Sequence, residues 1–259
     1  MEILKETDLI IENKTFKSAG IYISRSTNIT IRNCTFTNCP YGIYAYQSTN
    51  IVVENCRCYD ILGTYPRRQF VQFNEVQGGE VSNNIVLNNA GATPEDIISM
   101  FNSSGTKEKS ILIYNNTLTG GGPSTSGGGI MLGDHGGNYI QCYNNKLTNP
   151  GQYGIAIAGG SNMKVFGNTV YGERTAVSNV GIYVHNYNPK ESMANNAVYK
   201  NEIYWINKNN IRNDLWINDP GATYYSNVKL EKRVDDSKEE EASQIVYIGG
   251  LKIRLSIEK

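Results

Sequence analysis

The chain has 259 residues, enough to bury a substantial core in one domain or two. Its 24 basic and 24 acidic side chains balance, which argues against a nucleic-acid partner recruited by bulk charge. No apolar stretch is long enough to cross a bilayer and the first residues lack a signal-peptide pattern, so we expect a soluble chain without a membrane partner.

A short apolar motif recurs along the chain. The string N-I-T-I-R-N-C-T-F at Asn28 returns 22 residues later, at Asn50, as N-I-V-V-E-N-C-R-C. Each copy alternates apolar residues, turns at asparagine and resumes as a short strand, because asparagine accepts the left-handed turn conformation. Weaker copies begin at Leu9, Val81, Ile111, Ile140, Val165 and Val198.

A second strand lies between successive copies and usually opens with glycine. Its members are Gly20–Ile23, Gly42–Ala45, Phe70–Phe73, Asp96–Met100, Gly129–Leu132, Gly154–Ile157, Gly181–Val184 and Asp214–Ile217. Paired with the motif copies, these strands predict an all-β, single-stranded right-handed parallel β-helix of about eight coils over residues 1–220. Long helical crossovers are missing from the pattern, which excludes a doubly wound fold.

The alternation predicts which side chains form interior columns. One column holds Ile21, Ile43, Val71, Ile130, Ile155, Ile182 and Leu215, and the next holds Ile23, Ala45, Phe73, Leu132, Ile157, Val184 and Ile217. On the fourth coil either Ile97 or Ile98 could face inward. A third column places Cys34 and Cys56 where other coils have Asn84, Asn116, Asn145, Asn168 and Asn201. The spacing of the two cysteines allows a disulfide, but reduced, buried thiols are favoured.

The pattern N-x-x-I-x-N-(N/C)-x-(F/I/L) followed by G-I-Y resembles the pectin-lyase-like superfamily of right-handed parallel β-helices. It is similar in style to the carbohydrate-binding and sugar-hydrolase repeats of NosD-like proteins, over about residues 7–220. That superfamily includes lyases, hydrolases, epimerases, phage tailspikes and non-catalytic modules, so the resemblance implies a fold more than an activity. It implies a polysaccharide partner and an extracellular, cell-surface or virion-surface location.

In that superfamily the substrate lies along the outward face of the G-I-Y strands. Outward positions here are Tyr22, Tyr44, Gln72, Met131, Ala156, Tyr183 and Trp216, followed one step on by Ser24, Tyr46, Asn74, Gly133, Ala158, His185 and Asn218. We expect the aromatic rings of Tyr44, Tyr46, Tyr183 and Trp216 to stack on sugars, although cross-coil stacking alone would also explain them. Arg67 and Arg68, in a neighbouring loop, suit the carboxylates or sulfates of an acidic polysaccharide.

The candidate catalytic residues are Asp134, His135, His185 and Lys190. Histidine can move protons near neutral pH, and Asp134 could act as a general acid or base. The D-H-G-G string at Asp134 is similar to the G-H-G segment of polygalacturonases, whose other motifs are missing here. For a lyase, Lys190, His185 or Tyr183 would take the proton while Arg67 or Arg68 neutralised the uronate. A purely structural turn remains the alternative interpretation.

The sequence therefore favours a polysaccharide lyase or glycosidase acting on an extracellular, possibly acidic, polysaccharide. The alternative is a non-catalytic carbohydrate-binding or structural rod, such as a tail-fibre or surface-adhesion module. No cofactor is expected, because zinc and nucleotide motifs are missing and only Glu75, Asn102 and Asp134 hint weakly at a calcium site.

Residues 221–259 form a separate C-terminal part. After an acidic run at 235–241, the sequence predicts a hairpin about Gly249-Gly250 with Leu251, Ile253, Leu255 and Ile257 on one face. This hairpin could cap the last coil or act as an oligomerisation element, as in a homotrimer. The first coil begins by about residue 7 without a recognisable cap, which favours flanking domains in a longer protein.

Overall fold

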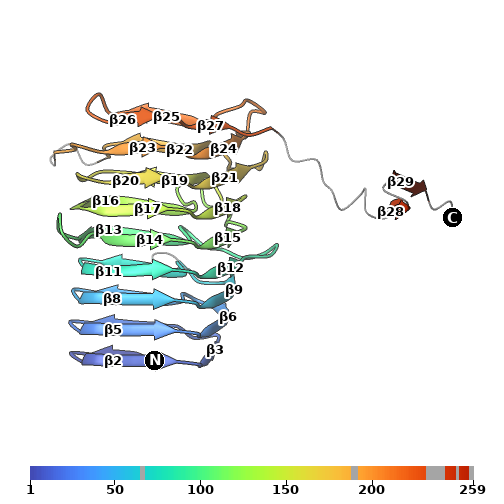
Figure 1. Ribbon diagram of the computed structural model, residues 1–259. Helices are drawn as coiled ribbons and strands as arrows, with labels where there is room; N and C mark the ends of the chain where they lie inside the picture. Colours follow the sequence, from blue (N-terminus) through green and yellow to red (C-terminus); the bar gives the residue numbers. More distant parts are fainter. Residues whose placement is uncertain (65–67, 188–191, 232–242, 249–250, 257–259) are drawn as a thin grey trace.

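The computed structural model describes residues 1–64, 68–187, 192–231, 243–248 and 251–256. In these residues strands are the only regular elements, and parallel strands stack as successive coils of a right-handed β-helix (Figure 1). No helix in this part of the chain is long and apolar enough to cross a membrane. The predicted fold class is confirmed.

Each coil contributes one strand to each of three rows. The first row consists of β1 (Glu2–Leu4), β4 (Ile21–Ser24), β7 (Ile43–Tyr46), β10 (Val71–Asn74), β13 (Ile98–Ser104), β16 (Ile130–Asn138), β19 (Tyr153–Ile157), β22 (Val180–His185) and β25 (Leu215–Asn218). The second row consists of β2 (Thr7–Glu12), β5 (Thr27–Arg32), β8 (Thr49–Glu54), β11 (Gln77–Ser82), β14 (Ile111–Tyr114), β17 (Ile140–Tyr143), β20 (Lys164–Phe166), β23 (Ala197–Tyr199) and β26 (Thr223–Tyr225). The third row consists of β3 (Thr15–Lys17), β6 (Thr35–Cys39), β9 (Arg57–Ile61), β12 (Ile85–Leu87), β15 (Thr117–Thr119), β18 (Lys146–Thr148), β21 (Thr169–Gly172), β24 (Glu202–Trp205) and β27 (Val228–Lys229).

The strand register confirms the interior columns. Ile21 pairs with Ile43, and the same column continues through Val71, Ile98, Ile130, Ile155, Ile182 and Leu215. Ile98 is thus the residue of the fourth coil that lies in this column, although Ile97 is equally buried. The described residues form nine coils rather than eight, because β1 in the first row, which pairs with β4, and β26 in the second row, which pairs with β23, were not among the predicted strands.

A buried column of asparagine amides joins the coils at the turn between the second and third rows. Asn83 adopts a φ of 55°, and the next residue, Asn84, donates from Nδ2 to Asn116 Oδ1 at 2.9 Å. The column runs on through Asn145, Asn168 and Asn201 to Asn227. These amides are saturated by main-chain and side-chain partners, which makes their burial favourable.

Cys34 and Cys56 lie in the same column at the first coils, as predicted. The backbone amide of Cys56 donates to Asn84 Oδ1 at 2.9 Å, so the main chain at Cys56 continues the asparagine column, while the Cys56 thiol donates to the Glu54 carbonyl. All five cysteines are free and buried.

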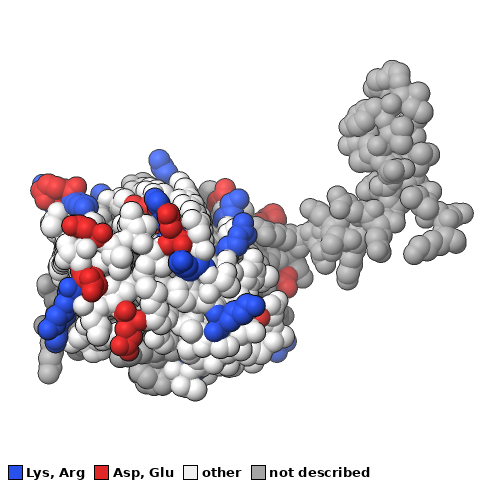
Figure 2. Space-filling model, turned by 90° about the horizontal axis from the view of Figure 1, so that it is seen from below, with Lys and Arg blue, Asp and Glu red and all other residues white. Residues whose placement is uncertain are grey.

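The C-terminal strands β28 (Ser243–Ile248) and β29 (Leu251–Ser256) pair antiparallel, with the two glycines of the predicted turn outside the described residues. Whether this hairpin caps a coil or joins chains stays a prediction. At the opposite end, Figure 2 views the rod from its first coil and shows acidic and basic side chains intermingled on that face.

Candidate functional site

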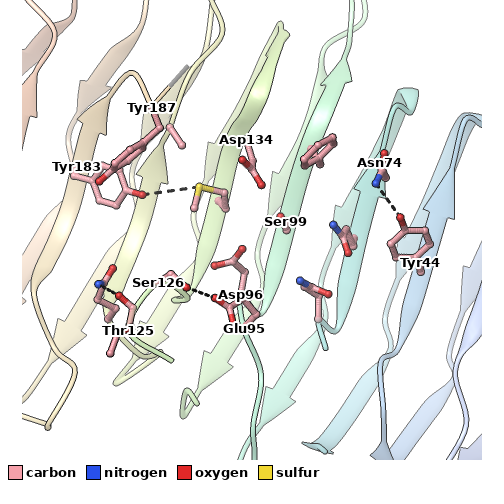
Figure 3. A pocket seen from close by; sticks show the side chains of 16 residues that line it. Tyr44, Asn74, Glu95, Asp96, Ser99, Thr125, Ser126, Asp134, Tyr183 and Tyr187 are labelled. Carbon is pink, nitrogen blue, oxygen red and sulfur yellow. Dashed lines mark hydrogen bonds between the residues drawn. The ribbon is translucent and has the colours of Figure 1, made fainter. Parts of the chain in front are cut away.

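A groove of about 600 Å³ runs over the outward face of the first row (Figure 3). It extends from β7 to β22, six neighbouring strands, or roughly 24 Å at the usual strand spacing. Its lining residues are Tyr44, Gln69, Gln72, Asn74, Glu95, Asp96, Ser99, Phe101, Thr125, Ser126, Met131, Asp134, Gln152, Ala158, Tyr183 and Tyr187. The groove therefore lies on the face that the alternation pattern marks as outward.

A β-bulge brings Asp134 into this groove. Leu132 pairs with Met100 but Asp134 pairs with Phe101, so Gly133 is an extra residue in β16. Gly133 adopts a φ of 69°, and a Cβ there would lie 2.1 Å from the Gly159 carbonyl oxygen. Only glycine suits this position, and the bulge turns Asp134 to the outward position that regular alternation assigns to Gly133.

Asp96 precedes β13 and is almost completely buried at the base of the groove. Its Oδ1 accepts hydrogen bonds from the Gly128 amide at 3.0 Å and from the Tyr153 hydroxyl. Burial raises the pKa of Asp96 to about 7, and these two hydrogen bonds only partly oppose the rise. Asp96 is therefore a carboxyl that keeps its proton close to neutral pH.

Asp134 is the second carboxyl with a raised pKa. Burial disfavours its charged form, while the neighbouring His135 pulls the pKa of Asp134 back down. The rise is smaller than for Asp96, so Asp134 is the first of the two to ionise as pH increases. Figure 3 shows both carboxyls facing the same groove from adjacent coils.

Glu95 behaves in the opposite way. Burial alone would raise the pKa of Glu95, but hydrogen bonds from Ser126, Ser124 and Arg68 outweigh it and the pKa lies below its ordinary value. Its Oε1 accepts from Ser124 Oγ at 2.8 Å and Ser126 Oγ at 2.5 Å, and its Oε2 is paired with Arg68. Glu95 is thus a carboxylate whose ionised form is stabilised and which anchors the loop that forms one side of the groove.

Three of the residues predicted from sequence line the groove: Asp134, Tyr44 and Tyr183. The Tyr44 hydroxyl accepts a hydrogen bond from Asn74 Nδ2 at 2.8 Å. Burial raises the pKa of Tyr183 far above its ordinary value. Tyr46, which pairs with Asn74 on the next strand, is half-buried and is not among the lining residues.

The two histidines do not line the groove. His135 is exposed and packs its ring on Phe101 at 4.6 Å between ring centroids. His185 lies beyond the end of the groove, where its ring stacks on Trp216 at 5.3 Å and its Nδ1 contacts Asn218 Nδ2 at 3.0 Å. Trp216 packs on His185, whose ring also contacts the groove residue Tyr187, but neither Trp216 nor His185 is a lining residue.

The predicted cations are not gathered at the groove in the described part of the chain. Arg68 is only 19% exposed and is committed to Glu95, while Arg67 and Lys190 lie outside the described residues. Of the three candidate catalytic residues that the structure describes, Asp134, His135 and His185, only Asp134 lines the groove.

No group of three or more histidine, cysteine, aspartate or glutamate side chains in the described residues could hold a metal ion. The bulge also moves Asp134 away from the position equivalent to Glu75 and Asn102, because Asp134 pairs with Phe101 instead. The calcium hint drawn from regular spacing therefore loses its geometric basis.

Sequence reasoning missed Glu95 and Asp96. One signal was available: two adjacent acids stand directly before the apolar pair Ile97-Ile98, where a buried charge needs a partner or a proton. Their partners come from distant positions, since Tyr153 lies 57 residues from Asp96. Spacing within the repeat does not show this contact.

The fold has many relatives of low sequence identity. A periplasmic alginate epimerase superposes with a TM-score of 0.56 at 16% identity, covering 86% of this chain and 50% of the other. The tailspike of an E. coli bacteriophage gives 0.58 at 14% identity, covering 86% and 45%. An alginate lyase from Paenibacillus sp. gives 0.53 at 14% identity, covering 86% and 95%. The chain spans about half the length of the first two proteins, and at these identities the likeness establishes the fold alone.

No curated protein sequence matches the chain. The family model described as the right handed beta helix region matches residues 1–141, more than half of the chain. With the stacked parallel coils and the pectin-lyase-like repeat pattern, this match shows that the chain belongs to the right-handed β-helix family.

Proposed function

We propose that the protein hydrolyses glycosidic bonds in a saccharide bound along the groove, with Asp96 as general acid and Asp134 as the ionised carboxylate. The observation that carries this proposal is the pair of groove carboxyls whose environments raise their pKa values to different extents. Such a difference assigns one carboxyl to donate a proton and the other to act as base or nucleophile.

Asp96 is oriented for proton donation. Both of its described hydrogen bonds fall on Oδ1, which leaves Oδ2 as the oxygen that carries the proton. Below about pH 7 this proton can pass to the glycosidic oxygen as its bond to the anomeric carbon breaks. In an inverting reaction Asp134 takes a proton from the water that attacks the anomeric carbon, and exchange with solvent then returns Asp134 to its ionised form and Asp96 to its protonated form. In a retaining reaction Asp134 attacks the anomeric carbon to form a glycosyl intermediate, and the ionised Asp96 then takes the proton of the water that displaces Asp134.

Glu95 supports this arrangement without taking part in proton transfer. Its hydrogen bonds to Ser124 and Ser126 hold the loop that borders the groove, and its ion pair fixes Arg68. The pKa of Glu95 is lowered, and its negative charge disfavours ionisation of the adjacent Asp96.

Hydrolysis fits the described residues better than β-elimination does. A lyase needs a base near the sugar C5 and a group that neutralises the uronate carboxylate. The high pKa of buried Tyr183 makes it a poor base at neutral pH, His185 lies outside the groove, and Arg68 is paired with Glu95. The names of the structural neighbours, a periplasmic epimerase and a phage tailspike, support an extracellular or surface polysaccharide as the substrate.

The test is a polysaccharide panel assayed for new reducing ends and, separately, for the unsaturated products of elimination. We expect reducing ends, with activity lowered at least about 100-fold by Asp96→Asn and by Asp134→Asn. Asp8→Asn is the matched control, because Asp8 is exposed on the second row and remote from the groove. Unsaturated products, or full activity in both groove variants, would contradict the proposal. Binding without turnover would favour the non-catalytic alternative.

A further inference from the structure

The described lining of the groove carries negative charge without positive charge. Glu95, Asp96 and Asp134 contribute carboxyls, whereas none of the described lining residues is lysine or arginine. Arg68, the nearest candidate named above, has its charge taken up by Glu95. A uronate or sulfate bound here would meet the ionised Glu95 and Asp134 without a described cation to balance it.

Two amide groups on β10 lack partners for their oxygens. Gln72 Oε1 and Asn74 Oδ1 are buried and have no hydrogen-bond partner among the described residues. They stand two residues apart and so share the outward face, where Gln72 pairs with Ser99 on the next strand. Figure 3 shows Asn74 beside Tyr44 at one side of the groove and Ser99 between them and the carboxyls.

An unpaired buried carbonyl oxygen is unfavourable unless a ligand donates a hydrogen bond to it. Sugar hydroxyls are such donors. A carboxylate or sulfate group can only accept, so the hydroxyls of the sugar must meet these oxygens. The unmet acceptors thus point to a hydroxyl-rich ligand, and the negative charge of the groove favours an uncharged ligand over an acidic one.

We infer that the groove takes an uncharged, hydroxyl-rich saccharide, and that Gln72 and Asn74 form the subsite for the sugar unit next to the point of cleavage. This inference rests on the proposed function for the place of cleavage, but recognition itself can be measured without turnover. The substrate class inferred here differs from the acidic polysaccharide that the sequence favoured because of the loop containing Arg67 and Arg68.

The experiment measures binding by calorimetry to the Asp96→Asn protein, which keeps the charge of a protonated Asp96 while removing the acid. The probes are hexasaccharides of glucose, mannose, xylose, galactose and N-acetylglucosamine, against oligogalacturonate and oligomannuronate of the same length. We expect at least one neutral probe to bind at least about tenfold more tightly than either uronate. Adding Asp134→Asn should improve uronate binding more than neutral binding.

The subsite is tested by adding Gln72→Leu, which should weaken the best neutral probe about tenfold. Gln141→Leu is the matched control, because Gln141 is half-buried on the second row and bonds Ser110 instead. Thermal unfolding of both variants checks that each still folds. An unchanged affinity in the folded Gln72→Leu protein would overturn the subsite.

The two proposals fail in different ways. Preferred binding of a uronate, or no binding of any neutral probe, would overturn the inference about substrate class. If uronates were hydrolysed through Asp96 and Asp134, the acid–base proposal would stand while this inference fell. If a neutral saccharide bound through Gln72 but was never cleaved by the wild-type protein, the inference about substrate class would stand and the acid–base proposal would fall.

Discussion

Asp96 should make the wild-type fold less stable as pH rises, and Asp96→Asn should remove this effect. The pKa of the carboxyl lies near 3.8 ordinarily and at about 7 in the folded protein. Between these values the folded state keeps a proton that the unfolded chain has lost, so the free energy of unfolding falls with increasing pH. Each pH unit in this window changes it by about 1.4 kcal/mol, and the whole window by about 4 kcal/mol.

The assay is urea unfolding of the wild-type and Asp96→Asn proteins at pH 5, 6, 7 and 8. Asparagine can still accept hydrogen bonds from Gly128 and Tyr153, but it does not ionise. The stability of the variant relative to wild type should therefore rise by about 3 kcal/mol between pH 5 and pH 8, because most of the titration falls in this range. Asp8→Asn provides the control for a general change in charge. A stability difference between wild type and Asp96→Asn that stays constant over this range would refute the reasoning.

Three further predictions concern the groove. On a cleaved substrate, kcat/KM should fall above about pH 7, because Asp96 loses its proton there. It should also fall on the acid side, where Asp134 becomes protonated at a pH above the ordinary pKa of 3.8. A kcat/KM that stays constant across this range would speak against the pair. Tyr153→Phe removes a hydrogen bond that lowers the pKa of Asp96, so the alkaline limb of the same profile should move to higher pH, and a downward shift would contradict the assigned role. Gly133→Ala should lower stability by about 1–3 kcal/mol more than Gly78→Ala in thermal or urea unfolding. Both glycines have a φ of 69°, but an added Cβ at Gly78 meets nothing within 4 Å; equal losses would show that the bulge tolerates a side chain.

The interior of the rod could be predicted because it follows from repetition. Alternating apolar residues separated by one coil place Ile21 on Ile43 and Ile130 on Ile155 without knowledge of the loops. The additional coil escaped prediction because β1 and β26 have only three residues each, too few to show alternation. The fold class, the core columns and the asparagine column can thus be predicted from the short repeated motifs alone.

The candidate site was only partly predictable because it depends on departures from the repeat. Asp134 was singled out for its residue type, but its outward position comes from the bulge at Gly133. The raised pKa of Asp96 arises from burial, which the hydrogen bond from Tyr153 on a later coil only partly opposes. His185 lies on the predicted face, yet it is not among the residues that line the groove. Burial and distant partners of this kind emerge only when the coils are stacked.

The asparagine column has a consequence for how the rod assembles. Asn116 Oδ1 accepts from both the backbone and the side chain of Asn84, and Asn145 repeats this towards Asn116. Each completed coil therefore presents a ready set of polar partners to the next one, so growth by addition resembles the closing of a zipper. The first pair of coils has no completed coil to add to and must close a loop of 20 residues, the separation of Asp8 and Asn28, so nucleation should be slow and later steps fast.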